Sequence, residues 1–356
     1  MLDQSASRVP AILAVVMFVP LIAGCERQLT VQPDRNVPGV YVHRTEMMGT
    51  DATIRVRASG IGQARQFIAD AVDALNRVEE RMSTYRRDSD ISRLNRYGAE
   101  QQVRVSQLTS RVLSRARHFS ELTDGAFDVT YAPLRSLWRR AQKSGKVPEE
   151  DEVESTLELV GYEQLSLDRG KARLQRDGME IDPGGLAKGF AIDRAVATLR
   201  EQGCRDALVD VGGDIGTLGE RSDESPWAIR VRDPREKTDS PIVLRLTGMA
   251  VATSGNYARF FRIGERTFSH IIDPRTGYPV NSVPSVTVIA PETETADALA
   301  TAISVMGADK GMTLVESIPE TECLIMSRTK TTPDQDIVSV DSSRNFSAYV
   351  EDTDDR

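Results

Sequence analysis

Apolar residues recur at steps of three and four along several stretches of the chain, the spacing of one face of an α-helix. The clearest stretch predicts a helix with this apolar face: Ala64, Phe67, Ile68, Ala71, Val72, Leu75, Val78 and Met82. The same reasoning predicts helices over Gln107–Leu122, over Leu186–Gln202, around Asp297 and near Lys310–Ser317. Gly203 suits the end of one of them, because glycine readily takes the left-handed conformation that caps a helix.

Alternation of apolar and polar residues predicts a strand near residues 53–58, where Ile54 and Val56 alternate with arginines. Further strands are expected over Ala207–Val211, Trp227–Arg232, Ile242–Leu246, Met249–Ala252, Thr267–Ile272, Ser285–Ala290 and Glu322–Ser327. Strands and helices do not alternate regularly, which favours an α+β fold over a doubly wound sheet. No repeat or strong linker divides the chain, so we expect a single large domain over residues 40–328.

The two ends of the chain differ from this domain. An apolar run closes on Ile22-Ala23-Gly24-Cys25 and resembles the lipobox of bacterial lipoproteins, which predicts a signal peptide over residues 1–24 and lipidation of Cys25. An uncleaved anchor or a plain export signal is the alternative. Residues 25–39 are predicted to be a polar tether, and residues 329–356 an acidic, loosely ordered tail.

Composition narrows the function further. The chain is 40% hydrophobic and 28% charged, with a net charge of −8, so it has the balance of a soluble globular protein and no basic footprint for nucleic acid. An acidic protein that binds a phosphate-bearing ligand needs a cation, backbone N–H groups or a few placed basic side chains. No C-x-x-C motif occurs and the histidines are scattered, which argues against a zinc site. Whether Cys204 and Cys323 pair stays open.

Two glycine-rich turns are candidates for ligand contact. In "IDPGGLAKGFAID", residues 181–193, a strand ends, two glycines turn the chain and a helix begins, so its first N–H groups are suited to bind an anion. It is not a Walker A loop, and a plain strand-to-helix turn is the alternative. "DVGGDIG", residues 210–216, is either close backbone packing near a site or a simple turn.

Asp297 and Thr301 lie four residues apart, and are therefore neighbours on one face of their predicted helix. A carboxylate and a hydroxyl together can be oxygen ligands for a hard cation such as Mg²⁺. A solvated polar stripe is the other interpretation of this spacing.

The segment over residues 251–279 concentrates polar side chains between short strands. His270 is the one histidine in this company, and its titration range suits proton transfer. A structural histidine bonded to a carbonyl group is the alternative. Ser254 does not indicate a serine hydrolase, because the motif G-x-S-x-G is missing.

Taken in order, the blocks "RMSTYRRDSDISRLN", "GAFDVTYAPL", "IDPGGLAKGFAID", "LVDVGGDIG", "ATSGNY", "SHIIDPRTGYP" and "ADALATAISVMG" resemble the ApbE family of bacterial flavin transferases. The resemblance implies that Asp297, Thr301 and the carbonyl of Gly185 bind Mg²⁺. It also implies contacts with FAD at these positions: Met48, Tyr85, Ala126, Phe127, Asp128, Asp182, Lys188 and Ile271.

The implied reaction is Mg²⁺-dependent transfer of FMN from FAD to a threonine hydroxyl of an acceptor flavoprotein, with release of AMP. His270 is the candidate general base. The resemblance implies acceptors that are membrane or periplasmic electron-transport subunits, and an enzyme anchored by lipid to the cell envelope and facing the periplasm. Two alternatives remain, an FAD pyrophosphatase with the same site and a flavin-binding lipoprotein without activity.

Overall fold

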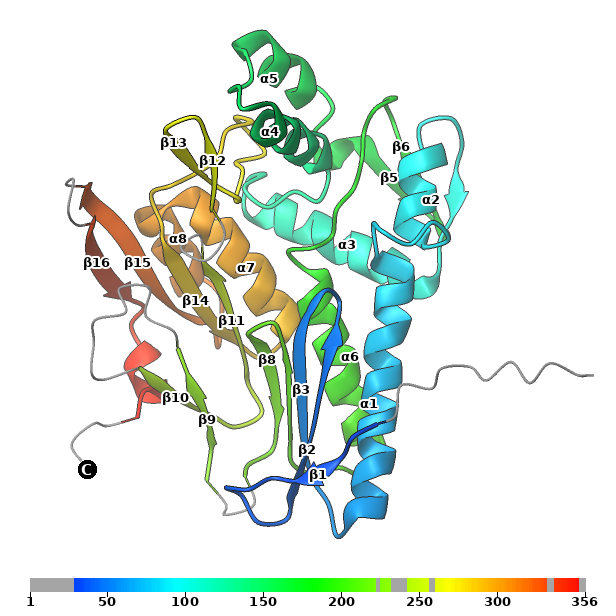
Figure 1. Ribbon diagram of the computed structural model, residues 1–356, viewed down its shortest axis with the longest axis vertical. Coiled ribbons are helices and arrows are strands. Elements are labelled where there is room, and N and C mark those ends of the chain that lie inside the picture. Colours follow the sequence, from blue (N-terminus) through cyan, green and yellow to red (C-terminus); the bar gives the residue numbers. More distant parts are fainter. Residues whose placement is uncertain (1–28, 222–224, 232–241, 256–259, 332–335, 352–356) are drawn as a thin grey trace, which may run out of the picture.

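The computed structural model describes residues 29–221, 225–231, 242–255, 260–331 and 336–351. Its framework is one antiparallel sheet (Figure 1), whose strands in spatial order are β1 (Gln32–Pro33), β2 (Val40–Met47), β3 (Thr50–Arg57), β7 (Ala207–Val211), β8 (Asp214–Leu218), β11 (Ala250–Gly255), β14 (Ser285–Ala290), β15 (Glu322–Thr331) and β16 (Asp336–Ser342). Strands from both halves of the sequence are thus joined in one layer, which confirms the predicted single α+β domain.

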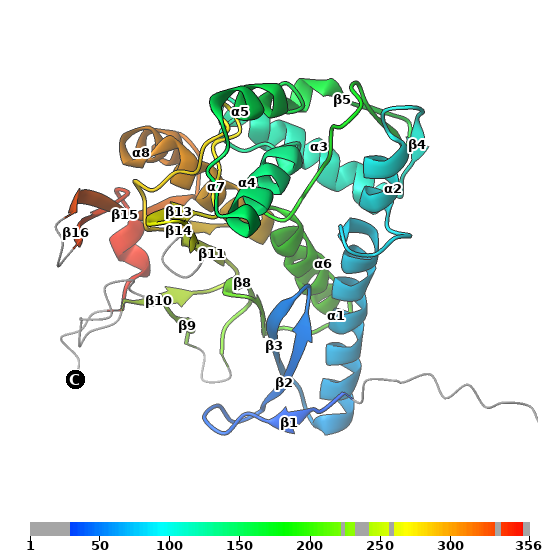
Figure 2. The ribbon, with the colours of Figure 1, turned by 45° about the horizontal axis from the view of Figure 1, so that its top comes forward.

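Four helices pack on one face of this sheet, as Figures 1 and 2 show: α1 (Ile61–Met82), α6 (Ala187–Glu201), α7 (Thr293–Met306) and α8 (Ala308–Glu316). The amphipathic face of α1 provides the packing surface, and its Ile68, Leu75 and Val78 are completely buried. α6 lies between α1 and α7, so the helix that begins at the glycine-rich turn packs against the helix that carries Asp297.

A second group of elements covers one end of the sheet. It contains α2 (Asp90–Tyr97), α3 (Gln107–Leu122), α4 (Ala132–Ser144), α5 (Glu150–Leu157) and a small sheet of β4 (Val103–Arg104), β6 (Lys171–Leu174) and β5 (Leu165–Asp168). Two hairpins complete the described fold, β9 (Trp227–Arg230) with β10 (Val243–Leu246), and β12 (Phe260–Ile263) with β13 (Arg266–Ser269). The apolar side of β12–β13 packs on Trp138 of α4.

The predicted boundaries at the two ends of the domain differ from the structure. Gln32 and Pro33 already pair with β2, so the sheet begins inside the range predicted to be a tether. The tail predicted to be loosely ordered contains β16, which pairs with β15. Phe346 is buried beneath it. The prediction of a loosely ordered tail was wrong because it was based on the polar composition of this segment. The order of β16 comes instead from its backbone pairing with β15 and from a few apolar side chains that follow it in the sequence.

The described helices include none that is both long and apolar enough to cross a membrane. The predicted signal peptide and Cys25 lie outside the described residues.

Candidate active site

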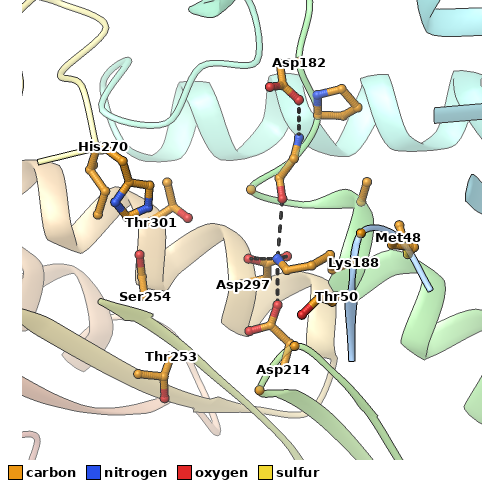
Figure 3. A pocket seen from close by; sticks show the side chains of 18 of the residues that line it. Met48, Thr50, Asp182, Lys188, Asp214, Thr253, Ser254, His270, Asp297 and Thr301 are labelled. Carbon is orange, nitrogen blue, oxygen red and sulfur yellow. Dashed lines mark hydrogen bonds and ion pairs between the residues drawn. The ribbon is translucent and has the colours of Figure 1, made fainter. Parts of the chain in front are cut away.

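A cavity of about 1380 Å³ opens between the sheet, α4 and one face of α7. Its lining includes all predicted site residues of the described chain: Met48, Tyr85, Ala126, Phe127, Asp128, Asp182, Gly185, Lys188, His270, Ile271, Asp297 and Thr301. They come from segments more than two hundred positions apart in the sequence, and the fold brings these segments together around one cavity. Figure 3 shows a central part of this cavity.

The glycine-rich turn over residues 182–186 is held from both sides. The Asp182 carboxylate accepts a hydrogen bond from the Gly184 N–H at 3.0 Å and pairs with the Arg135 guanidinium of α4. The turn approaches α7 closely at Gly185, because a methyl group there would lie 3.2 Å from both the Phe127 ring and the Thr301 hydroxyl oxygen. The turn therefore lies directly against α7, and it leads into the first turn of α6.

Lys188, on the first turn of α6, holds two carboxylates together (Figure 3). Its Nζ lies 2.7 Å from Asp214 Oδ2 and 3.1 Å from Asp297 Oδ2. Burial lowers the pKa of Lys188, but the two carboxylates outweigh this effect and hold that pKa above its ordinary value. Burial, together with the charge of Asp297, raises the pKa of Asp214 to about 7. The ammonium group thus compensates a pair of buried acids.

Asp214 was not among the predicted site residues. It follows the turn at Gly212–Gly213 in the motif "DVGGDIG", and both glycines have positive φ, at 67° and 93°. Such a turn matches the twist of an antiparallel hairpin and places Asp214 at the start of β8, facing the cavity. The sequence feature that could have indicated Asp214 is an acidic residue next to a pair of glycines. From the sequence alone, this feature could not be distinguished from an ordinary turn.

The oxygen ligands at the predicted metal site are of the type that Mg²⁺ prefers. The Asp297 carboxylate, the Thr301 hydroxyl and the Gly185 segment converge at one wall of the cavity, with Asp214 beside them. Among the described residues, no three His, Cys, Asp or Glu side chains are arranged to hold a metal by themselves. Mg²⁺ commonly uses one or two carboxylates and completes its shell with substrate phosphates and water. The residues present therefore fit a Mg²⁺ ion that binds together with a phosphate ligand.

The position of α7 is fixed by Asp193 of α6. Its carboxylate oxygens accept hydrogen bonds from the first N–H groups of α7, Thr293 at 2.7 Å and Glu294 at 2.8 Å. The two helices approach closely, since a methyl group on Gly189 would lie 2.5 Å from the Thr293 carbonyl oxygen. The helix that carries Asp297 is thereby anchored to the helix that carries Lys188.

The loop over residues 126–131 forms an apolar wall backed by a buried acid. Ala126 and Phe127 are buried at the cavity surface, and Ile271 packs in one apolar cluster with Ala126. The Asp128 carboxylate accepts hydrogen bonds from Thr130 N–H at 2.8 Å and from Tyr162 N–H at 2.8 Å. Burial raises the pKa of Asp128 to about 6. Its side chain thus holds the loop together, and its main chain is the part available to a ligand.

Met48 and Tyr85 lie on two turns at another part of the rim. Met48 has φ of 51°, and its N–H group donates to Glu79 Oε2 at 3.2 Å. Tyr85 follows α1 and is 81% exposed, which leaves its ring available to stack on a planar ligand.

His270 directly follows β13 and is exposed to the cavity. In the view of Figure 3, His270 and Ser254 lie on the side of Thr301 away from Lys188. The next residue, Ile271, is fixed through its N–H group, which donates to Ser269 Oγ at 3.0 Å. The cavity thus places an imidazole on one side of the predicted metal ligands and an ammonium on the other.

Comparisons with known proteins identify named relatives of this chain. The chain is 33% identical to the FAD:protein FMN transferase of Vibrio cholerae, over 86% of this chain and 90% of that protein. It is 30% identical to the FAD:protein FMN transferase of Haemophilus influenzae, with the same two coverages, 86% and 90%.

Solved structures are similar over the whole domain. The flavin transferase ApbE of Vibrio cholerae matches with a TM-score of 0.76 at 31% identity, over 87% of this chain and 99% of that one. The apo form of the flavinyl transferase ApbE of Pseudomonas stutzeri matches with a TM-score of 0.77 at 28% identity, over 89% and 98%. The model of the ApbE family matches residues 48–325, and the chain therefore belongs to the ApbE family.

Proposed function

We propose that this protein transfers FMN from FAD to a threonine hydroxyl of an acceptor flavoprotein and releases AMP. The observation that carries the proposal is the convergence of the family-implied residues on one cavity. Its volume of about 1380 Å³ exceeds the ~300–1,000 Å³ typical of small-ligand pockets, which leaves room for a dinucleotide and for part of a second reactant. The relatives named FAD:protein FMN transferase support the same reaction.

The reaction is a displacement at the FMN-side phosphorus of the FAD diphosphate. A bond forms between this phosphorus and the acceptor oxygen, and the bond to the bridging oxygen breaks, so that AMP leaves with the bonding electron pair. The hydroxyl proton passes to a base. In the turn that leads into α6, the N–H groups of Gly184, Leu186 and Ala187 already have acceptors, so the N–H group of Gly185 is the one suited to hold a phosphate oxygen.

Mg²⁺ would be held by Asp297, Thr301 and the carbonyl of Gly185, and when bound it would neutralise charge on the diphosphate. Lys188 would hold Asp297 and Asp214 close together at this wall, because its ammonium group pairs with both carboxylates. Tyr85 would stack on a planar part of FAD, while Ala126, Phe127 and Ile271 would provide an apolar surface and Met48, Asp128 and Asp182 would position the loops around it.

His270 is the proposed base, because it is exposed in the cavity on the side away from Lys188 (Figure 3). An acceptor segment bound beside it would bring the hydroxyl to the phosphorus and exclude water, which favours transfer over hydrolysis.

The test is to supply FAD, Mg²⁺ and a candidate acceptor, and to follow AMP release together with the acceptor mass. We expect AMP in equal amount to an FMN phosphoester on the acceptor. His270→Ala should slow transfer by about 100-fold and keep FAD affinity, as expected for the loss of a general base. His118→Ala is the matched control, because His118 is exposed on α3 and does not line the cavity. AMP with free FMN and unmodified acceptors would instead favour the pyrophosphatase, and FAD binding without any AMP would favour a non-catalytic flavin protein.

The proposal includes a location at the cell envelope. The apolar run that closes on Ile22-Ala23-Gly24-Cys25 supports a lipid anchor at Cys25, which would hold the domain at a membrane on its periplasmic side, beside acceptors among electron-transport subunits. Cys25→Ser should abolish acylation and release the protein from the membrane fraction. An unmodified Cys25 inside a longer chain, found by mass spectrometry of the native protein, would contradict the anchor.

A further inference from the structure

We propose that an extended segment of the acceptor binds as an added β-strand on the edge of β11, along Thr253–Gly255. This inference rests on the proposed function, because it requires that the acceptor be a protein. It concerns a part of the cavity to which the FAD and metal contacts described above do not extend.

The edge is open because of the register between β8 and β11. The two strands pair only at Ala250 with Gly216 and at Val251 with Ile215. β8 begins at Asp214, where the turn leads back to β7, so it does not extend opposite the last residues of β11. Within the described residues, no strand pairs with this side of β11 beyond Val251.

The backbone groups on this edge point into the open space. The carbonyl of Met249 accepts a hydrogen bond from Thr217 N–H at 3.1 Å, so the backbone groups of Met249 face β8. In an antiparallel sheet these groups point to alternate sides at successive residues. Thr253 and Gly255 therefore direct their N–H and C=O groups to the same side as Met249, whereas the residue between them faces β14.

The turn that precedes β8 is not crowded by the described residues. An added methyl group on Gly213 in this turn would meet no atom within 4 Å. The side chain of Thr253 is turned to its neighbour strand, with its hydroxyl 3.0 Å from that of Thr287 on β14. Thr253, Ser254 and Gly255 all line the cavity.

The edge also lies beside the proposed reacting centre. In Figure 3 the Ser254 hydroxyl points toward Thr301 and His270. A peptide paired with β11 would thus pass the phosphorus with its side chains pointing alternately into and out of the cavity. One of these positions would present the threonine hydroxyl.

An extended peptide is the partner that satisfies this edge best. Thr253 and Gly255 offer donor and acceptor pairs at the spacing of a β-ladder, and a second backbone in extended conformation pairs with both residues at once. Recognition through the main chain makes few demands on side chains.

The test uses a variant that removes one N–H group from the edge. Thr253→Pro removes the N–H group that faces the cavity and keeps the ladder with β14, since proline is tolerated where the missing N–H group lies on a strand edge. The matched control is Thr287→Val, which removes the same hydroxyl pair and leaves the edge intact. The probe is a pooled library of synthetic twelve-residue peptides with one central threonine, incubated with FAD and Mg²⁺ and analysed by mass. Fluorescence titration with FAD reports folding and the flavin site of each variant.

We expect Thr253→Pro to lower the yield of FMN-modified peptide at least ~10-fold, as expected for one lost hydrogen bond and a steric block, with FAD affinity unchanged. The Thr287→Val protein should modify the library within about twofold of the unaltered protein, because its edge hydrogen bonds remain. Equal yields from both variants, or an equal loss of FAD affinity and yield in Thr253→Pro, would overturn the proposal.

A second measurement needs no variant. Peptides modified by the unaltered protein are made again with a single N-methyl group on each backbone amide in turn. Strand addition predicts loss of modification at alternate positions, because only alternate amides face β11. Loss of modification at every position, or at none, would contradict strand addition but would leave the proposed FMN transfer standing. Release of AMP and free FMN with no modified peptide would contradict the proposed transfer, and with it the proposal that the acceptor binds to this edge.

Discussion

Asp297 is the residue on which the proposed chemistry depends most directly. It is 6% exposed, bonded to Lys188, and the one proposed metal ligand with a charged side chain. Asp297→Ala should lower Mg²⁺-dependent transfer on the order of 100-fold or more, because the diphosphate charge loses its compensation. The fold should survive, since alanine is a good helix former and Lys188 keeps Asp214 as a partner.

The matched control for Asp297→Ala is Thr295→Ala. Thr295 lies on the same helix but does not line the cavity. Transfer rates and Mg²⁺ titrations are compared for the two proteins after circular dichroism has shown that both are folded. A folded Asp297→Ala protein with the Mg²⁺ response of the control would refute the metal assignment.

Among single residues, those that belong to a local sequence pattern could be predicted as site residues. Those whose role depends on contacts in the tertiary structure could not. Asp297 and Thr301 could be predicted as a pair because a four-residue step makes them helix neighbours. Asp214 and Arg135 could not, since their partners in the structure are far away along the chain. The roles of Met48 and Tyr85 came only from the family resemblance, and those roles stay predictions.

At the scale of elements, the contact between α6 and α7 positions the site. Asp193→Ala would leave Thr293 N–H and Glu294 N–H without their partner, at a cost of about 1–3 kcal/mol in the free energy of unfolding. A looser α7 should also raise the Mg²⁺ concentration needed for half-maximal transfer. Glu292→Ala is the control, because Glu292 is the N-cap residue of the same helix and its side chain accepts no hydrogen bond from the N–H groups of the first turn. Equal unfolding energies and equal Mg²⁺ titrations for the two variants would show that Asp193 does not position the helix.

The elements that could be predicted are those with a long amphipathic repeat. The helix predicted over Gln107–Leu122 is found with the same bounds, and α1 and α6 agree to within a few residues. α2, α4 and α5 were not predicted. For α2 and α5, eight residues give the repeat too little length. In α4, Leu134, Leu137, Trp138 and Ala141 do follow the helical spacing, but the surrounding basic residues conceal it.

At the scale of the whole molecule, one antiparallel sheet joins segments from both ends of the sequence and brings their loops to one cavity. This joining could not be predicted, because the central strands β7, β8 and β11 pair in an order that depends on which turns are tight. The β7–β8 hairpin is short because of its glycine pair, and the same short turn leaves the edge of β11 open. The tight β7–β8 turn thus places Asp214 beside the proposed metal ligands and also leaves the proposed docking edge of β11 open.

Burial of acids around this cavity should make the stability of the whole protein depend on pH. Burial raises the pKa of Asp128 to about 6, and raises those of Asp193 and Asp214 to about 7, from an ordinary value of 3.8. Between about pH 4 and pH 7 these three acids therefore bind more protons in the folded protein than in the unfolded chain, so their contribution to the free energy of unfolding falls as the pH rises through this window. Asp128 alone would contribute up to about 3 kcal/mol of this fall, at 1.36 kcal/mol for each pKa unit.

Asp128→Asn tests this contribution away from the metal ligands. The variant should be less stable at every pH, because its amide group has a single acceptor oxygen and cannot accept from both Thr130 N–H and Tyr162 N–H. Its unfolding energy, measured with urea in steps from pH 4 to pH 7, should nevertheless fall less steeply than that of the unaltered protein. Asp124→Asn makes the same charge change at an exposed position of the same loop and corrects for net charge. Parallel curves for Asp128→Asn and the unaltered protein would mean that Asp128 does not exchange its proton on unfolding, and that the cavity wall tolerates an ionised acid at no cost.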